Sequence, residues 1–189
     1  MKDLEKLFSY SIANEIMPDL SSDARRDKAS HFALILDFGE TISKAEIEEI
    51  KKRTCLNPLF IDAFEGEERR SISSSYARRL RAPTVKPKSI SELVATLTNT
   101  SFSVCENLNG AFFSFLANTP SYLNAGNEEC RRFLGEICKY DIASEIVMPY
   151  TKNRTAVIRR PTVCEKDFYI AKNKFRAEIS AKFKEILYY

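Results

Sequence analysis

The sequence predicts an all-α protein, a compact helical core with N- and C-terminal arms or extensions, on three observations. Apolar residues recur mostly at intervals of three and four residues, the spacing of one face of a helix. Five glycines and seven prolines leave few breaks in 189 residues, and the alternating runs that indicate half-buried strands are missing. A hydrophobic content of 44% suffices for a core. We expect one domain, with residues 1–38 as an N-terminal helical arm or subdomain and residues 39–189 as the helical core with a long C-terminal helix.

The first part of the chain contains four expected helices. Three of them follow from apolar spacing and from N-terminal cap residues. Ser43 and Glu46 have the spacing of a capping box, in which the serine hydroxyl and the glutamate carboxylate each accept a backbone N–H that a first helical turn leaves unpaired. The expected helices span residues 4–17, 23–38, 43–54 and 57–64.

The rest of the chain is expected to be helical after an irregular middle. Residues 69–91 contain Ser73-Ser74-Ser75 and two prolines, which disfavour a helix. Thr162 and Glu165 have the spacing of a second capping box, which opens a last helix with an apolar stripe of about 20 residues. Between these segments, helical spacing predicts helices over residues 91–102, 108–116 and 130–147.

The charges are divided unevenly along the chain. Residues 1–68 carry nine Lys and Arg against fifteen Asp and Glu, whereas residues 69–189 carry twenty against eleven. Two stretches contain no acid: the one between Glu68 and Glu92 holds seven cations, and the one between Glu145 and Glu165 holds four. Cations without acidic neighbours favour a polyanion partner, because binding releases counterions from phosphates. The alternative is a solvated basic face without a partner.

The cysteines do not indicate a metal site. They are odd in number and widely spaced, and only one histidine could assist them. Zinc sites normally use closely spaced pairs of ligands, so free thiols in a reducing compartment are the preferred interpretation. We expect no metal and no cofactor. The five residues are Cys55, Cys105, Cys130, Cys138 and Cys164.

No run of apolar residues approaches the roughly 20 that a membrane-spanning helix needs. Charges interrupt the first twenty residues, so a signal peptide is not indicated either. We therefore expect no membrane partner and an intracellular, non-secreted protein.

Signals for catalysis are few, and we expect a protein that is not an enzyme. His31 is the single histidine, and neither a nucleophile elbow nor a glycine-rich phosphate loop is present. Arg26 and His31 have an R-x4-H spacing that resembles HEPN-type ribonucleases, in which the two side chains would stabilise and protonate an RNA phosphate. The alternative is a partly buried helical histidine beside Phe32.

The segment before the last expected helix resembles the coat proteins of flexible filamentous plant viruses, of the potexvirus and carlavirus type. Met148-Pro149 and then Ile158-Arg159-Arg160-Pro161-Thr162 are similar to the family's Met-Pro or Ile-Pro turn and its Leu-Ile-Arg-x-Pro-(Ser/Thr) segment. Upstream, Ile42 to Glu46 and Asn57-Pro58-Leu59 resemble its early helix and turn.

The resemblance implies an all-helical core whose arms link subunits into a filament around single-stranded RNA. The expected function is therefore a structural RNA-binding coat protein or nucleoprotein, found in the virion and the host cytoplasm, whose partners are RNA and other copies of itself. The alternatives are a HEPN-like ribonuclease and a helical protein-interaction module.

Phosphate contacts are assigned to exposed cations, and three further residues are given structural roles. Glu136 would orient Arg132 through an ion pair, and the two acid-free stretches would form the walls of one groove. The expected nucleic-acid-binding residues are Arg78, Arg79, Arg81, Lys86, Lys88, Arg132, Arg159 and Arg160, and the expected structural residues are Glu136, Thr162 and Glu165.

Overall fold

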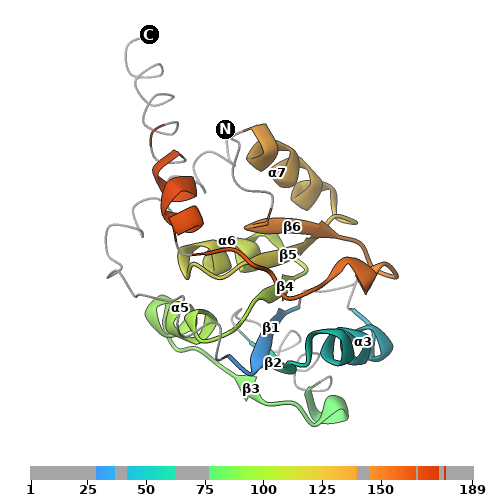
Figure 1. Cartoon of the computed structure of the whole chain (residues 1–189). Coiled ribbons are helices and arrows are strands. Elements are labelled where there is room, and N and C mark those ends of the chain that lie inside the picture. The colour runs from blue at the N-terminus through green and yellow to red at the C-terminus, as the bar shows by residue number, and fades with distance from the viewer. Residues whose placement is uncertain are drawn as a thin grey trace.

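A parallel β-sheet lies at the centre of the computed structural model, which describes residues 29–36, 42–62, 77–139, 145–164, 166–174 and 177 (Figure 1). In these residues the sheet has six strands in the order β3-β2-β1-β4-β5-β6, and all neighbouring strands are parallel. The expectation of an all-α protein is therefore wrong, and the fold is α/β. The strands are His31–Ile35 (β1), Asn57–Ile61 (β2), Thr84–Val85 (β3), Ser103–Cys105 (β4), Ser121–Asn124 (β5) and Val147–Tyr150 (β6).

Helices connect successive strands, as parallel pairing requires. Two further segments, residues 77–80 and 166–174, are also helical. None of the helices in the described part of the chain is long and apolar enough to cross a membrane. The labelled helices are Lys44–Thr54 (α3), Ile90–Thr98 (α5), Leu108–Leu116 (α6) and Glu128–Lys139 (α7), with a 3-10 turn at Thr155–Val157 (η1).

Two hydrophobic clusters cover the two faces of the sheet. Ile35, Cys105 and Leu123 belong to the cluster that includes side chains of α5, α6, α7 and the 166–174 helix. Their neighbours along the strands, such as Leu34 and Val104, belong to the other cluster, which includes α3 and the 77–80 turn. Successive side chains of a strand point to opposite faces. Helices on both faces and the strand order 3-2-1-4-5-6 define a doubly wound α/β fold.

Several expected helices are strands in the structure. Residues 31–35, 57–61 and 147–150 were expected in helices or at their ends, but each forms a strand. The helix expected over residues 91–102 ends at Thr98, before β4. Strands of a parallel sheet are buried on both faces, so their apolar residues run on without the alternation that identifies a half-buried strand. A short run of this kind cannot be distinguished from a buried helical segment by periodicity.

Other expectations about helices are confirmed. The capping box of Ser43 and Glu46 is formed at the start of α3, and α6 has the expected bounds. The helix expected over residues 4–17 lies outside the described residues. Residues 31–35, which fall in the expected N-terminal arm, form β1 and lie between β2 and β4 in the sheet.

A hydrogen bond between Cys164 and Asp167 lies at the start of the last helix. The Cys164 backbone N–H donates to the Asp167 carboxylate at 2.9 Å. Thr162 donates its hydroxyl hydrogen to Glu145 at 3.2 Å. The partner expected for the Thr162 oxygen, the Glu165 N–H, is not among the described residues, so the capping role of Thr162 stays a prediction.

Close packing of α6 on the sheet depends on a glycine. A Cβ atom built on Gly110 would lie 3.0 Å from Cγ2 of Ile35 and 3.2 Å from Cβ of Cys105. Both neighbours are buried in strands and cannot move away easily. The absence of a side chain at residue 110 therefore lets the first turn of α6 approach β1 and β4.

We predict that Gly110→Ala destabilises the protein by about 1–3 kcal/mol, because overpacking displaces the buried strands. Gly135→Ala is the matched control, since a Cβ there meets no atom within 4 Å and alanine favours a helix. This control should leave stability unchanged or raise it by up to about 1 kcal/mol. Urea unfolding of the two variants measures both effects, and equal effects would contradict the packing role of Gly110.

Candidate functional site

A row of polar residues lies at the carboxyl edge of the sheet, immediately beyond the paired strand residues. The register pairs Ile61 with Val85, Ile35 with Cys105, and Cys105 with Leu123. The residues that follow these pairs in β1, β2, β3 and β4 therefore lie at one level across the sheet. Asn124 of β5 and Tyr150 of β6, which pair with each other, lie at the same level. We call this set the carboxyl-edge row: Lys86, Asp62, Leu36, Glu106, Asn124 and Tyr150.

The carboxyl-edge row faces α3 and is largely buried. Leu36 and Tyr150 belong to the hydrophobic cluster on the α3 side, and residues at one level of a sheet share a face. Glu106 is 5% exposed, Asn124 is 2% exposed and Tyr150 is 3% exposed. Polar groups are buried only where hydrogen bonds or a ligand compensate for lost water. The buried polar side chains at the amino edge, such as Ser103 and Ser121, are hydroxyls, whereas the carboxyl edge buries a carboxylate, an amide and a phenol.

Glu106 connects the two loops that diverge at the middle of the row. Its carboxylate accepts the backbone N–H of Ile42 at 2.6 Å, just before α3 begins. The next residue, Asn107, caps α6 by accepting the Gly110 N–H at 2.8 Å. The starts of α3 and α6 therefore both lie near the carboxyl ends of β1 and β4, on opposite faces of the sheet, where the strand order reverses.

Glu46 makes a second connection on the α3 side. One carboxylate oxygen accepts from the Ser43 N–H at 2.8 Å and the Ser43 hydroxyl at 2.6 Å, and the other accepts the Asn153 N–H at 2.6 Å. Burial opposes ionisation of Glu46, but these hydrogen bonds and the charge of Lys152 outweigh burial and lower its pKa. An ionised Glu46 thus ties the start of α3 to the loop after β6.

Tyr150 keeps its proton at this edge. Burial raises its pKa well above the ordinary value, and the negative charges of Glu106 and Glu46 add to the effect. The hydroxyl is therefore a hydrogen-bond donor at neutral pH. Burial likewise raises the pKa of the Cys105 thiol to about 12, so this cysteine is not an activated nucleophile.

Asp62 and Lys86 occupy the β2–β3 end of the row. The Asp62 side chain is 5% exposed, and its Oδ2 atom lies 3.7 Å from the Lys86 ammonium group. The Asp62 backbone N–H donates to the carbonyl of Val85 at 2.9 Å, which fixes the carboxylate at the strand end.

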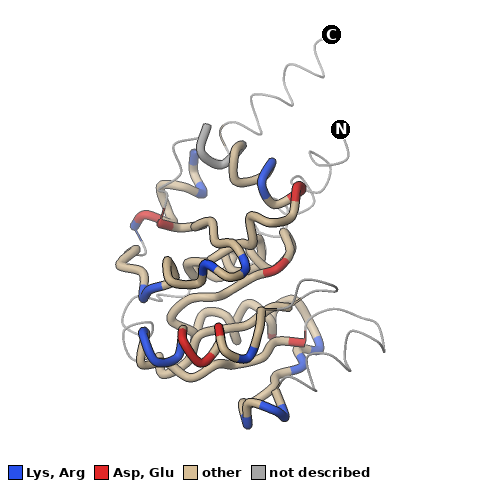
Figure 2. The backbone as a smooth tube through the Cα atoms, turned by 90° about the vertical axis from the view of Figure 1, so that its right-hand side faces the viewer, with Lys and Arg blue, Asp and Glu red and all other residues tan. Residues whose placement is uncertain are grey.

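The expected phosphate-binding residues are distributed over separate parts of the fold. Arg78 and Arg79 lie on the 77–80 turn, Arg81 follows it with a φ of 51°, and Lys86 and Lys88 follow β3. Basic segments also occur on elements far from these (Figure 2).

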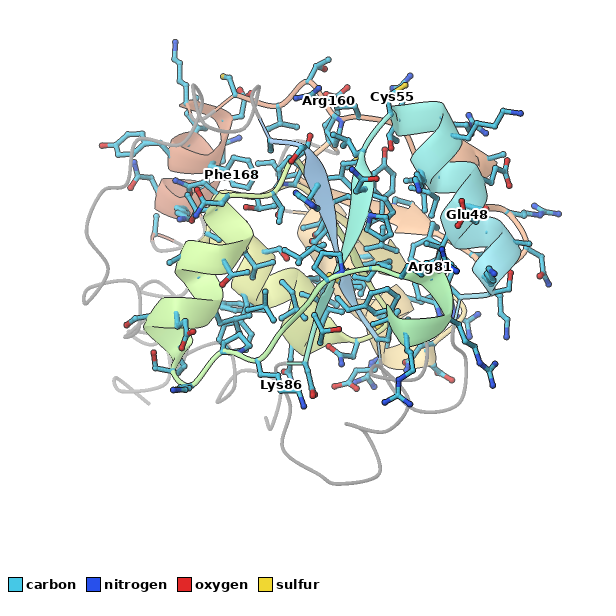
Figure 3. The ribbon with its side chains drawn as sticks, turned by 90° about the horizontal axis from the view of Figure 1, so that it is seen from below. Glu48, Cys55, Arg81, Lys86, Arg160 and Phe168 are labelled. Carbon is cyan, nitrogen blue, oxygen red and sulfur yellow. The ribbon has the colours of Figure 1, made fainter. Side chains whose placement is uncertain are left out.

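Lys86 and Arg160, one residue from each acid-free stretch, lie at opposite ends of the strands. In Figure 3, Arg160 lies at the same end of the view as Cys55, which comes two residues before the start of β2. Lys86 lies at the opposite end of the view. Lys86 is therefore at the carboxyl end of the strands and Arg160 at the amino end. The backbone of Arg159 both donates to and accepts from the Tyr122 hydroxyl, at 3.1 and 2.9 Å, so its main chain is held on the sheet.

Two other expected residues lie on α7. Arg132 lines an open depression with Glu128 and Arg131. Glu136 lies in α7, but its side chain is outside the described residues, so the expected ion pair with Arg132 stays a prediction.

The residues of the HEPN-like alternative are only partly described. His31 begins strand β1, where the sequence predicted a helix, and its Nδ1 atom lies 2.8 Å from the Ser30 hydroxyl oxygen. Arg26 lies outside the described residues. In the part of the chain that the structure describes, no group of three or more His, Cys, Asp or Glu is placed to hold a metal ion.

The carboxyl-edge row was not predicted, although the sequence contains a signal for it. Short, mainly apolar runs end in a polar residue at Asp62, Glu106 and Asn124. This pattern is typical of parallel strands, whose carboxyl ends carry polar side chains. It was not recognised because the runs were assigned to helices.

Comparisons with known proteins do not identify a family. No protein-family model matches the chain, and no curated protein matches it. The resemblance to plant-virus coat proteins implied an all-helical core, which the parallel sheet contradicts, so the all-α, capsid and RNA-binding descriptions are not carried forward. The class that the structure defines is a doubly wound α/β protein.

We predict that Glu46→Gln lowers stability at pH 7 by about 1–3 kcal/mol, because a buried carboxylate loses charge-assisted hydrogen bonds. The lowered pKa means that the folded protein holds this proton less tightly than the unfolded chain. The stabilisation is therefore complete above the unfolded pKa and disappears as the pH falls through the folded pKa.

Thermal unfolding of wild type and Glu46→Gln between pH 3 and pH 7 should show a difference that shrinks at the acidic end. Glu48→Gln is the control, since Glu48 is exposed on the same helix. A difference for Glu46→Gln that does not depend on pH would contradict the role of its ionised carboxylate.

Proposed function

We propose that this chain is a domain that binds a small polar molecule at the carboxyl-edge row, where β1 and β4 diverge. In open α/β sheets, ligands bind outside the carboxyl ends of the strands at the point where the strand order reverses. The strand order places that point between β1 and β4. A fold alone does not define an activity, so the proposal rests on the site.

The buried polar side chains at this point are the observation that carries the proposal. Glu106 and Asn124 carry side-chain oxygens that accept the Ile42 and Gly126 N–H groups and have further lone pairs, and the protonated Tyr150 carries a donor. Few polar groups in a buried setting give a ligand its orientation and specificity. At the amino edge the paired residues Ser103 and Ser121 are also buried, but they carry only uncharged hydroxyls.

The lining favours ligands with N–H or O–H donors over phosphates. The Glu106 carboxylate lies where dinucleotide-binding proteins place a pyrophosphate, and its negative charge would repel one. The β1–α3 connection contains one glycine, Gly39, and two acids, Asp37 and Glu40, instead of a glycine-rich turn. A phosphate cradle of backbone N–H groups is thus not encoded in this connection.

We predict that a thermal-shift panel of amines, sugars, amino acids and nucleotides will contain compounds that stabilise the protein through this site. A ligand at one hundred times its Kd should add about 2.7 kcal/mol to the free energy of unfolding. Glu106→Gln should abolish the shift, because the amide keeps an acceptor for the Ile42 N–H but loses the charge.

The control variant is Glu48→Gln, which removes an equal charge from the exposed face of α3. It should keep the ligand-induced shift. Stabilising compounds whose effect survives in Glu106→Gln would place the binding site elsewhere and contradict the proposal.

A further inference from the structure

We propose that the carboxyl end of β2 binds the ammonium group of a small organic amine, with the Asp62 carboxylate as its counterion. This inference rests on the proposed function, because it names the ligand class of the same carboxyl-edge row. Three observations carry it: the state of the Asp62 carboxylate, the position of Lys86, and the charges along the row.

The Asp62 carboxylate has an oxygen that the described residues leave unsatisfied. Oδ2 is buried and accepts no hydrogen bond from any of them, and the side chain as a whole is 5% exposed. A buried acceptor without a donor is costly, and a carboxylate oxygen more so than a neutral one. A buried acceptor of this kind requires a physical explanation, and a ligand donor would satisfy it.

Lys86 shows that this carboxylate attracts an ammonium group, but does not satisfy it. Its Nζ atom lies 3.7 Å from Oδ2, beyond the length of roughly 2.7–2.9 Å of a charge-assisted hydrogen bond. The Lys86 side chain is 60% exposed and lies at the strand ends in Figure 3. An exposed lysine can leave such a contact easily, so a ligand amine can replace it.

The charges along the row select an amine over other ligands. Asp62 follows β2 and Glu106 follows β4, and β1 lies between these two strands, so their backbones are separated by roughly 10 Å. An anion would be repelled by both, and a neutral polyol would leave the Asp62 charge uncompensated. Mg²⁺ and Ca²⁺ need several oxygen ligands, and the described residues provide no group of three.

The test is calorimetric titration of the full chain with putrescine and spermidine, with myo-inositol and AMP as comparison ligands. Putrescine or spermidine should bind wild type and should bind Asp62→Asn at least about tenfold more weakly, because one partner of a buried charged contact is lost. Lys86→Ala should strengthen amine binding by roughly two- to fivefold, because a competing exposed ammonium is removed.

Lys88→Ala is the matched control for Lys86→Ala. Lys88 is exposed two residues further along, and the hydrogen bond that it makes to Glu92 comes from its backbone N–H. This variant should bind amines like wild type. Weaker binding in Lys86→Ala, or equal binding in Asp62→Asn, would overturn the inference, as would the absence of amine binding to both wild type and Lys86→Ala.

The outcomes separate this inference from the proposed function. If myo-inositol or AMP binds wild type but not Glu106→Gln, and amines do not bind, the amine inference fails and the carboxyl-edge site stands. If all binding persists in both Glu106→Gln and Asp62→Asn, both fail. Should Asp62→Asn not fold, the Lys86→Ala and Lys88→Ala pair decides, since both substitutions are on exposed side chains.

Discussion

Pairing of β1 with β2 on one side and with β4 on the other is the constraint on which the rest of the structure depends. Main-chain hydrogen bonds such as Ala33 N–H to Phe102 carbonyl, 2.8 Å, and Glu106 N–H to Ile35 carbonyl, 3.0 Å, fix the register of the central strands. Because a side chain's face alternates along a strand, this register decides which apolar residues meet α3 and which meet α6. It also brings the last residues of all strands to one level, which creates the carboxyl-edge row.

Two buried glutamates stabilise that edge by accepting hydrogen bonds from backbone N–H groups. Glu106 and Glu46 accept backbone N–H groups of Ile42, Ser43 and Asn153, which loops and helix starts leave unpaired. The start of α3 is thereby tied to the end of β4, and the connection between β6 and η1 is tied to α3. A positioned edge of this kind is the rigid support that a binding site needs, because the polar groups keep their geometry before a ligand arrives.

The fold distributes the basic residues more widely than their spacing in the sequence suggests. Acid-free stretches in the sequence gather cations only if the fold brings them to one surface, and here Lys86 and Arg160 lie at opposite ends of the strands. Around β3, a strand of two residues at the edge of the sheet, lysines and arginines also have a plain structural value. Charged residues at an edge strand discourage pairing with other chains.

The sequence by itself determined the local features, whose causes lie within a few residues. The Ser43–Glu46 capping box and the bounds of α6 were predictable because caps and short-range spacing are local. Only the tertiary structure decided that residues 31–35 and 57–61 are strands, because their continuous apolar runs fit a buried helix equally well until partners are known. Likewise Asp62, Glu106 and Asn124 are single polar residues in the sequence, and they become one site only through the register of parallel strands, which long-range backbone hydrogen bonds impose.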